Sequence, residues 1–246
     1  MEIINIVLLT YARPERLYEQ LKSLEVQTCS NQICLHIVNN NIDYEAQIKS
    51  IIKQFDSLDI RFVQRNNKTI CFERFYYVRE NLLDTKFVIF IDDDQIYSNN
   101  QIEDLVNKFE YKTFCTWYGR VFDKNENPAN FYSKTPQYCL SNEEPQITEF
   151  HYGGPGFSII DTQIFDSNSI LWDFENWSDE LKQTVYKMDD IMLSWTISKL
   201  KDWKIKRSFN PPYQTVKDKK AISKPLNKSG KKAKFVEYLN NLSNWV

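Results

Sequence analysis

Apolar, strand-like runs alternate with amphipathic helical segments over the first 110 residues of the chain. The apolar runs lie at 3–9, 33–38, 59–64 and 87–91, and the helical segments lie at 12–27, 44–55, 71–83 and 100–109. Strands that alternate with helices through short links favour a parallel sheet with helices on both faces. We therefore predict an α/β fold with a mainly parallel central sheet. In such sheets, ligands bind beyond the carboxyl ends of the strands.

Beyond residue 110 this regular alternation ends. Residues 113–123 have the pattern of a strand, whereas 125–146 are polar and contain prolines, which is typical of a loop. The segment HYGGPGFSIID at 151–161 holds three of the five glycines. Residues 186–200 are helical in pattern and apolar on most sides, so this helix is predicted to be largely buried.

Three consecutive carboxylates follow the fourth apolar run. FVIFI at 87–91 leads directly into Asp92, Asp93 and Asp94. Adjacent acids repel one another, so they require either water or a positive charge nearby. Oxygen ligands at a strand end suit Mg2+ or Mn2+, especially where phosphate supplies further oxygens. In an extended chain Asp92 and Asp94 project to one side and Asp93 to the other. A solvated acidic loop or a helix cap is the alternative.

A second pair of acids, Asp189 and Asp190, lies in the segment YKMDDIMLSW. If the helix begins near this point, both acids lie in its first turn, where the helix dipole stabilises negative charge. Simple stabilisation of the helix end explains such a pair. A carboxylate that stays ionised at neutral pH also meets the requirement for a general base.

Residues at the rim of the predicted sheet have the chemistry to contact a ligand. Tyr11 offers a ring that can stack on a base, and Thr10, Arg13 and Asn39 offer groups that can bond a nucleotide. Each of these residues has an alternative role in a turn or a cap. Gly153-Gly154 removes side chains where the backbone can approach a ligand, or else marks a plain turn.

The charge of the chain is distributed unevenly. The net charge is −2, yet residues 201–246 contain 12 Lys or Arg against 3 Asp or Glu. A basic tail on an acidic body suggests an anionic partner, such as a membrane surface, a lipid diphosphate or the phosphates of a nucleotide, over which the tail can order as a lid. A solvated tail is the alternative, and the Lys-rich residues from about 215 to 234 are expected to be mobile.

The cysteines and the apolar runs bear on the compartment. The chain has five cysteines, at positions 29, 34, 71, 115 and 139. Their number is odd, and no two of them form a C-x-x-C pair. This pattern argues against a disulfide framework or a zinc site and favours a reducing compartment. The first residues lack a basic leader, and no run approaches the roughly 20 apolar residues of a membrane span. We expect a cytoplasmic protein, with peripheral membrane contact through the tail as an open alternative.

Taken together, these segments resemble an inverting glycosyltransferase of the Rossmann-like GT-A fold, similar to the large family two of bacterial capsule and polysaccharide enzymes. The resemblance covers roughly residues 3–200 and lies in IVLLTYARPERLYEQLKSLEVQT, HIVNNN, NNKTICFERFYYV, FVIFIDDD, HYGGPGFSII and MDDIMLSW. The chain departs from the family pattern in four places, one of which is that no His follows His151, although some relatives use a C-terminal His as a metal ligand. Asp189 stands for the usual Glu, Asn39 for the usual acid, and Thr69 for a glycine.

The resemblance implies a donor site for a nucleoside diphosphate sugar, with a UDP-sugar favoured. The base lies near Tyr11 and Asn39, and the diphosphate binds a divalent cation, Mn2+ or Mg2+. Asp94 is the main metal ligand, and Asp92 is a second ligand or a ribose contact. The residues assigned to the donor are Thr10, Tyr11, Arg13, Asn39, Arg74, Asp92 and Asp93.

The resemblance also implies an acceptor site for a hydroxyl of a glycan or glycolipid, and no nucleic acid partner. The acceptor lies between Gly153-Gly154 and Asp190, and Trp117 forms a wall of the sugar site. Asp190 removes the hydroxyl proton in a single displacement that inverts the anomeric carbon, and Asp189 orients the acceptor or Asp190. The implied division is a GT-A domain at 1–214, with a nucleotide-binding half at about 1–110 and an acceptor half at about 111–214, and a basic tail at 215–246.

Two other functions account for part of the pattern. A Mg2+-dependent phosphatase of the haloacid dehalogenase type uses a strand ending in D-x-D, with Asp92 as nucleophile and Asp94 as acid. That motif normally opens its fold, however, and here three strand–helix units precede it. A GT-A module that binds nucleotide or glycan without turnover is the second alternative, although intact acids in both motifs argue against it.

Overall fold

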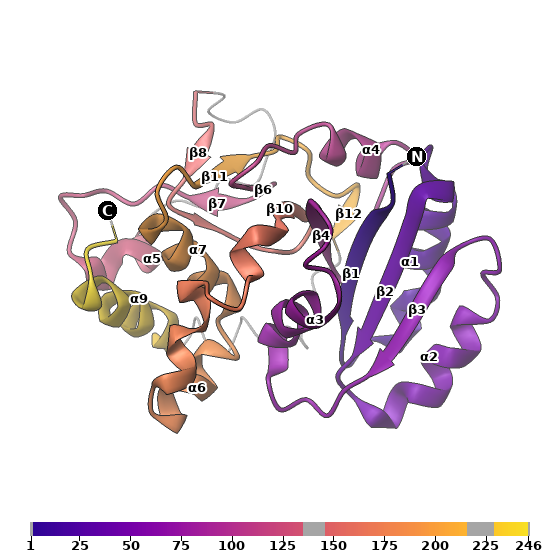
Figure 1. Ribbon diagram of the computed structural model, residues 1–246, viewed down its shortest axis with the longest axis horizontal. Coiled ribbons are helices and arrows are strands. Elements are labelled where there is room, and N and C mark those ends of the chain that lie inside the picture. The colour runs from indigo at the N-terminus through magenta and orange to yellow at the C-terminus, as the bar shows by residue number, and fades with distance from the viewer. Residues whose placement is uncertain (1, 135–145, 216–228, 246) are drawn as a thin grey trace.

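The computed structural model describes residues 2–134, 146–215 and 229–245, and these residues build one large sheet (Figure 1). The order of its strands is β3-β2-β1-β4-β10-β6-β11-β8. Strands β3, β2, β1 and β4 are mutually parallel, whereas β10 is antiparallel to both β4 and β6. The strands are β1 Ile4–Thr10, β2 Ile33–Asn39, β3 Asp59–Gln64, β4 Phe87–Asp92, β6 Thr113–Thr116, β8 Glu149–Phe150, β10 Ser158–Asp161 and β11 Lys204–Arg207. The predicted α/β fold is confirmed.

Helices cover both faces of the sheet and create two hydrophobic cores (Figure 1). Because side chains alternate along a strand, Ile6 and Leu8 of β1 enter one core while Val7 enters the other. The first core receives α1 Pro14–Glu25, α2 Glu45–Ile52 and α4 Gln101–Val106. The second receives α3 Glu73–Asn81, α7 Asp189–Lys199 and α9 Lys231–Leu242.

The parallel half of the sheet brings several strand ends to one edge. Leu9 of β1 pairs with Asp92 of β4, and Thr10 pairs with Asn39 of β2. Helix α1 starts at Pro14, whose fixed φ suits a first helical position, so the chain turns sharply after β1. The predicted ligand edge therefore carries the ends of β1, β2 and β4 together.

The part of the chain after residue 110 has shorter and more interrupted strands than its sequence pattern predicts. The single strand predicted at 113–123 is divided into β6 and β7 Gly119–Arg120, because the chain turns at Trp117 and Tyr118. Strand β7 pairs with β9 Tyr152–Gly153 in a small separate sheet. The segment predicted as a loop contains η4 Pro128–Asn130 and α5 Phe131–Lys134, and its residues 135–145 lie outside the described structure.

Further elements complete the described part of the chain. A two-stranded sheet pairs β5 Gln95–Ile96 with β12 Gln214–Thr215. Helix α6 Asp179–Val185 precedes α7. The remaining short helical turns are η1 Ser30–Gln32, η2 Ile42–Tyr44, η3 Ile70–Phe72, η5 Thr162–Phe165 and η6 Ile170–Asn176.

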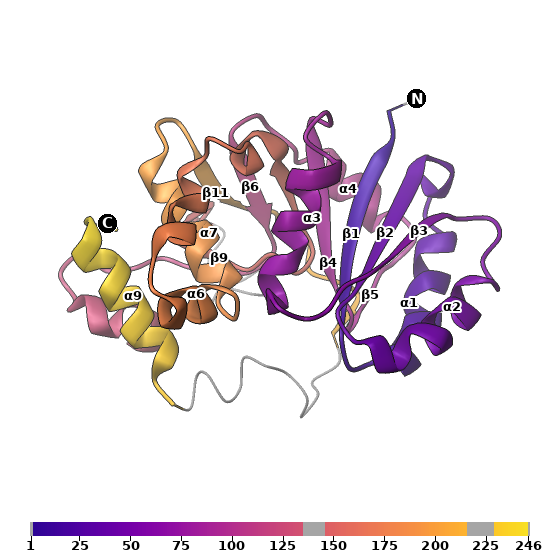
Figure 2. The same cartoon turned by 60° about the horizontal axis from the view of Figure 1, so that its bottom comes forward.

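The described part of the basic tail is a packed helix. Helix α9 buries Phe235, Val236 and Leu239, and it packs on α5 and α7 (Figure 2). The indole of Trp195 in α7 donates a hydrogen bond to the Leu239 carbonyl at 3.1 Å. The interpretation of a solvated tail is therefore wrong for residues 231–242, because burial of their apolar face stabilises the helix. The Lys-rich residues 216–228 lie outside the described structure.

The described residues include four of the five cysteines and most of the apolar runs. Cys29, Cys34, Cys71 and Cys115 are free thiols, and Cys139 falls outside the described ranges. Among the described residues, no helix combines the length and the apolar character that a bilayer crossing needs.

Candidate active site

The two acidic motifs lie in one pocket. A cavity of about 370 Å³ opens at the carboxyl ends of β1 and β4, and both motifs line it. Asp92, Asp93 and Asp94 come from the end of β4 and the turn that follows, and Asp189 and Asp190 come from the first turn of α7. Two groups of acids that are almost a hundred residues apart in the sequence thus form a single candidate site.

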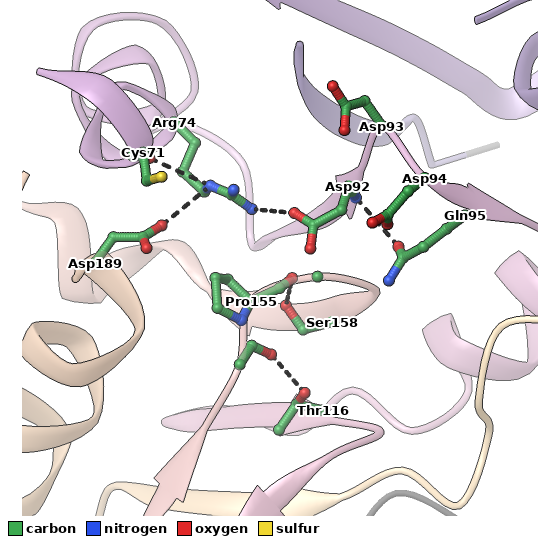
Figure 3. A network of polar contacts seen from close by, with 12 residues as sticks. Cys71, Arg74, Asp92, Asp93, Asp94, Gln95, Thr116, Pro155, Ser158 and Asp189 are labelled. Atoms are coloured by element: carbon green, nitrogen blue, oxygen red, sulfur yellow. Dashed lines mark hydrogen bonds and ion pairs between the residues drawn. The ribbon is translucent and has the colours of Figure 1, made fainter. Parts of the chain in front are cut away.

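Arg74 joins the two acidic groups (Figure 3). Its Nη1 lies 3.1 Å from Asp92 Oδ1, and its Nε lies 3.2 Å from Asp189 Oδ2. Burial opposes the charge of the guanidinium, but Asp189 and Asp92 outweigh it and raise the pKa of Arg74. Helix α3 therefore supplies a buried positive charge that offsets one carboxylate from each acidic group, Asp92 and Asp189.

Arg13 offsets the remaining two acids of the triplet. Its Nη1 pairs with Asp93 Oδ1 and lies 3.4 Å from Asp94 Oδ2. The chain turns at 93–94 instead of continuing as a strand, yet the Asp93 carboxylate still points away from those of Asp92 and Asp94 (Figure 3). Arg13 pairs with Asp93 and lies near Asp94, whereas Arg74 pairs with Asp92.

Asp94 is the least neutralised of the three acids. Its contact with Arg13 is longer than a normal charge-assisted hydrogen bond. Burial and the neighbouring Asp92 raise the pKa of Asp94 to about 7, against the opposing effect of Arg13. A cation beside Asp94 would relieve this unfavourable charge, so its carboxylate fits a divalent metal ion.

The pocket does not supply a complete metal coordination shell by itself. Within residues 2–134, 146–215 and 229–245, no three His, Cys, Asp or Glu side chains converge as metal ligands. Mg2+ is commonly bound by only one or two carboxylates together with substrate phosphates and water. The donor set of Asp94 and Asp92 therefore suits a cation that shares its coordination with phosphate oxygens.

The glycine-rich turn supports the site through packing. A Cβ on Gly154 would lie 1.9 Å from the Tyr118 ring, and one on Gly153 would lie 2.7 Å from the Thr116 side chain. Neither glycine lines the pocket. Glycine is needed at these positions because β6, β7 and β9 pack closely, and not because a ligand approaches the backbone there, as the sequence suggested. Trp117 does line the pocket, and its indole donates to the Gly156 carbonyl at 2.7 Å.

Gly156 positions Asp92, and its replacement is expected to disturb the site. A Cβ at this position would lie 2.1 Å from Asp92 Oδ2, so Gly156→Ala must displace the carboxylate from Arg74. We expect a loss of about 1–3 kcal/mol in the free energy of unfolding, measured by urea denaturation. In an Asp92→Ala background the obstructing oxygen is absent, and the same substitution should cost clearly less. Equal costs in the two backgrounds would contradict this account of Gly156.

Asp190 forms a buried ion pair with Lys232 of α9. Lys232 Nζ lies 2.7 Å from Asp190 Oδ2, and the two side chains are 6% and 10% exposed. Burial acts to raise the pKa of Asp190, but the Lys232 ammonium and the hydrogen bonds from Lys232, Tyr152 and the Ile191 N–H lower it overall. Sequence reasoning missed Lys232, although Phe235, Val236 and Leu239 give residues 231–242 a helical apolar spacing.

Asp189 differs from its neighbour in charge environment. Burial raises the pKa of Asp189 to about 6, with Arg74 lowering it and Asp190 raising it further. Its Oδ2 faces Arg74 rather than Lys232. The two acids of the motif thus have separate cationic partners, one on each side of the helix start.

Three tyrosines that sequence reasoning did not select also line the pocket. They are Tyr118, Tyr132 and Tyr152. Burial raises the pKa of Tyr118 and Tyr152 well above the ordinary tyrosine value, so both stay protonated at neutral pH. The Tyr152 hydroxyl donates to Asp190 Oδ2. Aromatic residues are frequent in this chain, and their sequence pattern does not separate pocket tyrosines from core tyrosines.

The residues predicted at the rim of β1 and β2 fall into two groups. Tyr11 and Arg13 line the pocket, whereas Thr10 and Asn39 do not. The Asn39 amide is fully buried and donates to the Asn41 carbonyl at 2.6 Å and to Gln64 Oε1 at 2.8 Å. Asn39 therefore ties the ends of β2 and β3 together, and its contact with a base stays a prediction.

Comparisons with known proteins bear on the fold of this chain. No protein-family model and no curated protein matches the chain. Among solved structures, GalNAc-T7 with UDP, GalNAc and Mn2+ is similar with a TM-score of 0.58 and 9% identity, over 96% of this chain and 50% of that one. TarS of S. aureus gives a TM-score of 0.54 and 15% identity, over 88% of this chain and 37% of that one.

A third similar structure is the mannosyltransferase PcManGT of Pyrobaculum calidifontis in complex with GDP-Man and Mn2+, with a TM-score of 0.52 and 11% identity. The match covers 88% of this chain and 58% of that one. The chain thus spans between about a third and three fifths of the length of these proteins. At such identities the likeness establishes the fold, and the chain has the GT-A glycosyltransferase fold.

Proposed function

We propose that this chain is a glycosyltransferase that moves a sugar from a nucleoside diphosphate sugar, with a UDP-sugar favoured, to a hydroxyl of a glycan or glycolipid. The observation that carries the proposal is the joining of two acidic motifs by Arg74 in one pocket, at the strand edge where α/β sheets bind ligands. The acids at the end of β4 are suited to bind the phosphates of a donor through a divalent cation. The acids at the start of α7 are suited to an acceptor hydroxyl. The resemblance to family two of these enzymes supports the assignment.

The donor occupies the side of the pocket formed by β1 and β4. Tyr11 is 42% exposed at the rim and offers a ring face to a base. Arg13 and Arg74 supply fixed positive charge close to the predicted diphosphate position. Asp94 would be the main ligand of a divalent cation, Mn2+ or Mg2+, and Asp92 would be the second ligand; such a cation would supply Lewis-acid stabilisation of the leaving diphosphate.

The acceptor occupies the side formed by α7. Asp190 is the general base, because it lies in the pocket, is ionised, and belongs to the motif that supplies the base in similar enzymes. Asp190 takes the proton of the acceptor hydroxyl as the oxygen attacks the anomeric carbon from the face opposite the diphosphate. This single displacement inverts the anomeric carbon. Trp117 and Tyr118 form walls suited to the flat faces of sugars.

A thermal-shift panel tests the donor assignment. UDP, GDP, dTDP and inorganic phosphate are each measured with Mn2+, with Mg2+ and with chelator. A ligand that binds only the folded state stabilises it by RT ln(1 + [L]/Kd), about 2.7 kcal/mol at a hundredfold excess over Kd. We expect one nucleoside diphosphate to stabilise the protein in a metal-dependent way, with UDP strongest, and we expect Asp94→Ala to lose the effect.

Other results of this panel would point to other functions. Stabilisation by Mg2+ and phosphate without any response to nucleotides would contradict the proposal and favour the phosphatase. Stabilisation by nucleotide without donor hydrolysis or transfer would favour a binding module. Asp104→Ala, at an acid of α4 that does not line the pocket, is the matched control and is expected to respond like the wild type.

A further inference from the structure

A lysine from the C-terminal helix lies against the proposed base. Lys232 is 5% exposed, and its ammonium contacts Asp190 Oδ2 at 2.7 Å. It also lies 3.3 Å from the Tyr132 hydroxyl and 5.2 Å from the centre of the Tyr132 ring. A buried lysine needs polar or anionic partners, and both partners of Lys232, Asp190 and Tyr132, line the pocket. The position of Lys232 is therefore set by the site as well as by the packing of α9.

Three donors hold the Asp190 carboxylate in place. Lys232 and the Tyr152 hydroxyl bond Oδ2, and the Ile191 N–H bonds Oδ1 at 2.9 Å. An ionised carboxylate has about four lone-pair sites, so these donors leave room for an acceptor hydroxyl. The carboxylate is thus both fixed in orientation and available to a substrate.

The surroundings of Asp190 contain several other ionisable groups. Besides Lys232 itself, ionisable groups from several elements surround the Asp190–Lys232 pair. They are Asp189, Arg74, Cys71, Tyr118, Tyr132 and Tyr152. Lys232 is the cation in contact with Asp190, whereas Arg74 contacts Asp189. Removing the Lys232 charge therefore leaves Asp190 with hydroxyl and amide donors but without its contacting cation.

The proposed reaction changes the charge on Asp190. A bond forms between the acceptor oxygen and the anomeric carbon, and the bond from that carbon to the diphosphate breaks. The proton of the acceptor passes to Asp190, and the electron pair of the broken bond leaves with the diphosphate. Asp190 thereby loses its negative charge while the diphosphate gains negative charge in the same pocket. The Lys232 ammonium stabilises the ionised form of Asp190, which is the form that can accept the proton at the start of this step.

From this geometry we infer that Lys232 is a positioning residue of the transfer reaction, which keeps Asp190 ionised and directed at the acceptor hydroxyl. The inference rests on the proposed function. It gives α9 two roles, because Lys232 is required for turnover while Phe235, Val236 and Leu239 pack the helix on the core. It also assigns a role to the basic C-terminal segment that does not require a membrane or a lid.

The test compares pH profiles of nucleoside diphosphate release in four proteins. They are the wild type, Lys232→Met, Lys232→Arg and the control Lys231→Met, which removes an exposed lysine from the adjacent position of the same helix. In Lys232→Met the acidic limb of kcat is expected to move up by at least about one pH unit, because a buried carboxylate without a cation is protonated more readily. The KM for the donor stays unchanged, and Lys232→Arg and Lys231→Met keep the wild-type limb.

A second variant and a measurement without substrate keep the test decisive. Should Lys232→Met fail to fold, Lys232→Gln removes the charge and retains hydrogen-bonding groups, with the same shift expected. The loss of folding stability in these variants is expected to be largest near pH 7 and to shrink as the pH falls, because Asp190 then becomes neutral. A loss that is constant from pH 7 to 4 overturns the assigned pairing.

Failure of this inference differs from failure of the proposed function. A wild-type protein that turns over, together with a Lys232→Met variant whose acidic limb is unchanged, overturns only the role of Lys232. A wild-type protein that releases no nucleoside diphosphate from any donor overturns the proposed function, and the inference with it. A shifted limb that Lys232→Arg restores supports the inference.

Discussion

Replacing Asp190 with asparagine is expected to reduce sugar transfer by about 100- to 10,000-fold, because the amide cannot accept the proton of the attacking hydroxyl. The rate is measured as nucleoside diphosphate release at saturating donor. Donor binding should survive, because the groups proposed to hold the phosphates are Arg13, Arg74 and the acids at the end of β4, and Asp190 is not among them. Near-normal turnover in Asp190→Asn would show that another group is the base.

The fold of this variant must be checked, because Asp190 is half of a buried ion pair. Removing one partner of such a pair costs about 3–5 kcal/mol. The double variant Asp190→Asn/Lys232→Met removes both charges and should recover part of that stability without recovering activity. Asp179→Asn is the matched control, since Asp179 also lies in the first turn of a helix but its side chain is 98% exposed.

Arg74→Met is expected to cause a comparably large loss of stability, about 3–5 kcal/mol in the free energy of unfolding. The substitution leaves Asp92 and Asp189 close together without their shared cation, in a pocket where the Arg74 side chain is 8% exposed. Urea denaturation at pH 7 measures the effect. Lys49→Met is the control, because its ion pair with Glu45 is exposed and such helix pairs contribute about 0.3–0.5 kcal/mol.

The pH dependence of this loss provides a further check. Burial already raises the pKa of Asp189 to about 6 in the presence of Arg74, and removing Arg74 raises it more. A carboxyl whose folded pKa lies above its unfolded value gains stability as the pH falls. The deficit of Arg74→Met should therefore shrink below pH 7 as Asp189 becomes protonated. A loss smaller than that of Lys49→Met would contradict the bridging role of Arg74.

The sequence predicts the parallel half of the sheet well, because its signals are local. The apolar run at 87–91 ends in acids, and the structure places those acids at the end of β4. The pattern at 59–64 coincides with β3. Alternation of these runs with helical segments determines which strand ends share an edge, so the position of the candidate site follows from the sequence.

The arrangement within the site depends on contacts between distant residues, which no local pattern specifies. The three adjacent acids are paired with two arginines that lie far away in the sequence, since Arg13 contacts Asp93 and Asp94 and Arg74 contacts Asp92. Asn39 resembles a ligand contact in the sequence, yet its amide is used by Asn41 and Gln64. The requirement for Gly154 comes from the Tyr118 ring, which lies 36 residues earlier in the chain.

Lys232 is the clearest case of a site residue that a motif cannot reveal. It lies in a segment whose many lysines suggest a solvated surface, and only the apolar residues on the same helix indicate packing. The structure buries this one lysine against Asp190 and leaves Lys231 exposed. A single position in the helix thus separates an active-site cation from a surface charge.

The central claim, sugar transfer from a nucleoside diphosphate donor in the Arg74 pocket, is tested most directly by donor turnover. Wild type and Asp190→Asn are incubated with UDP-, GDP- and dTDP-sugars, Mn2+ and a mixture of glycan and glycolipid acceptors, and nucleoside diphosphate release is measured. The account predicts acceptor-stimulated release from one class of donor, with UDP-sugars favoured, by the wild type and a loss of at least about 100-fold in Asp190→Asn. No release from any donor, or equal release by the two proteins, would contradict it.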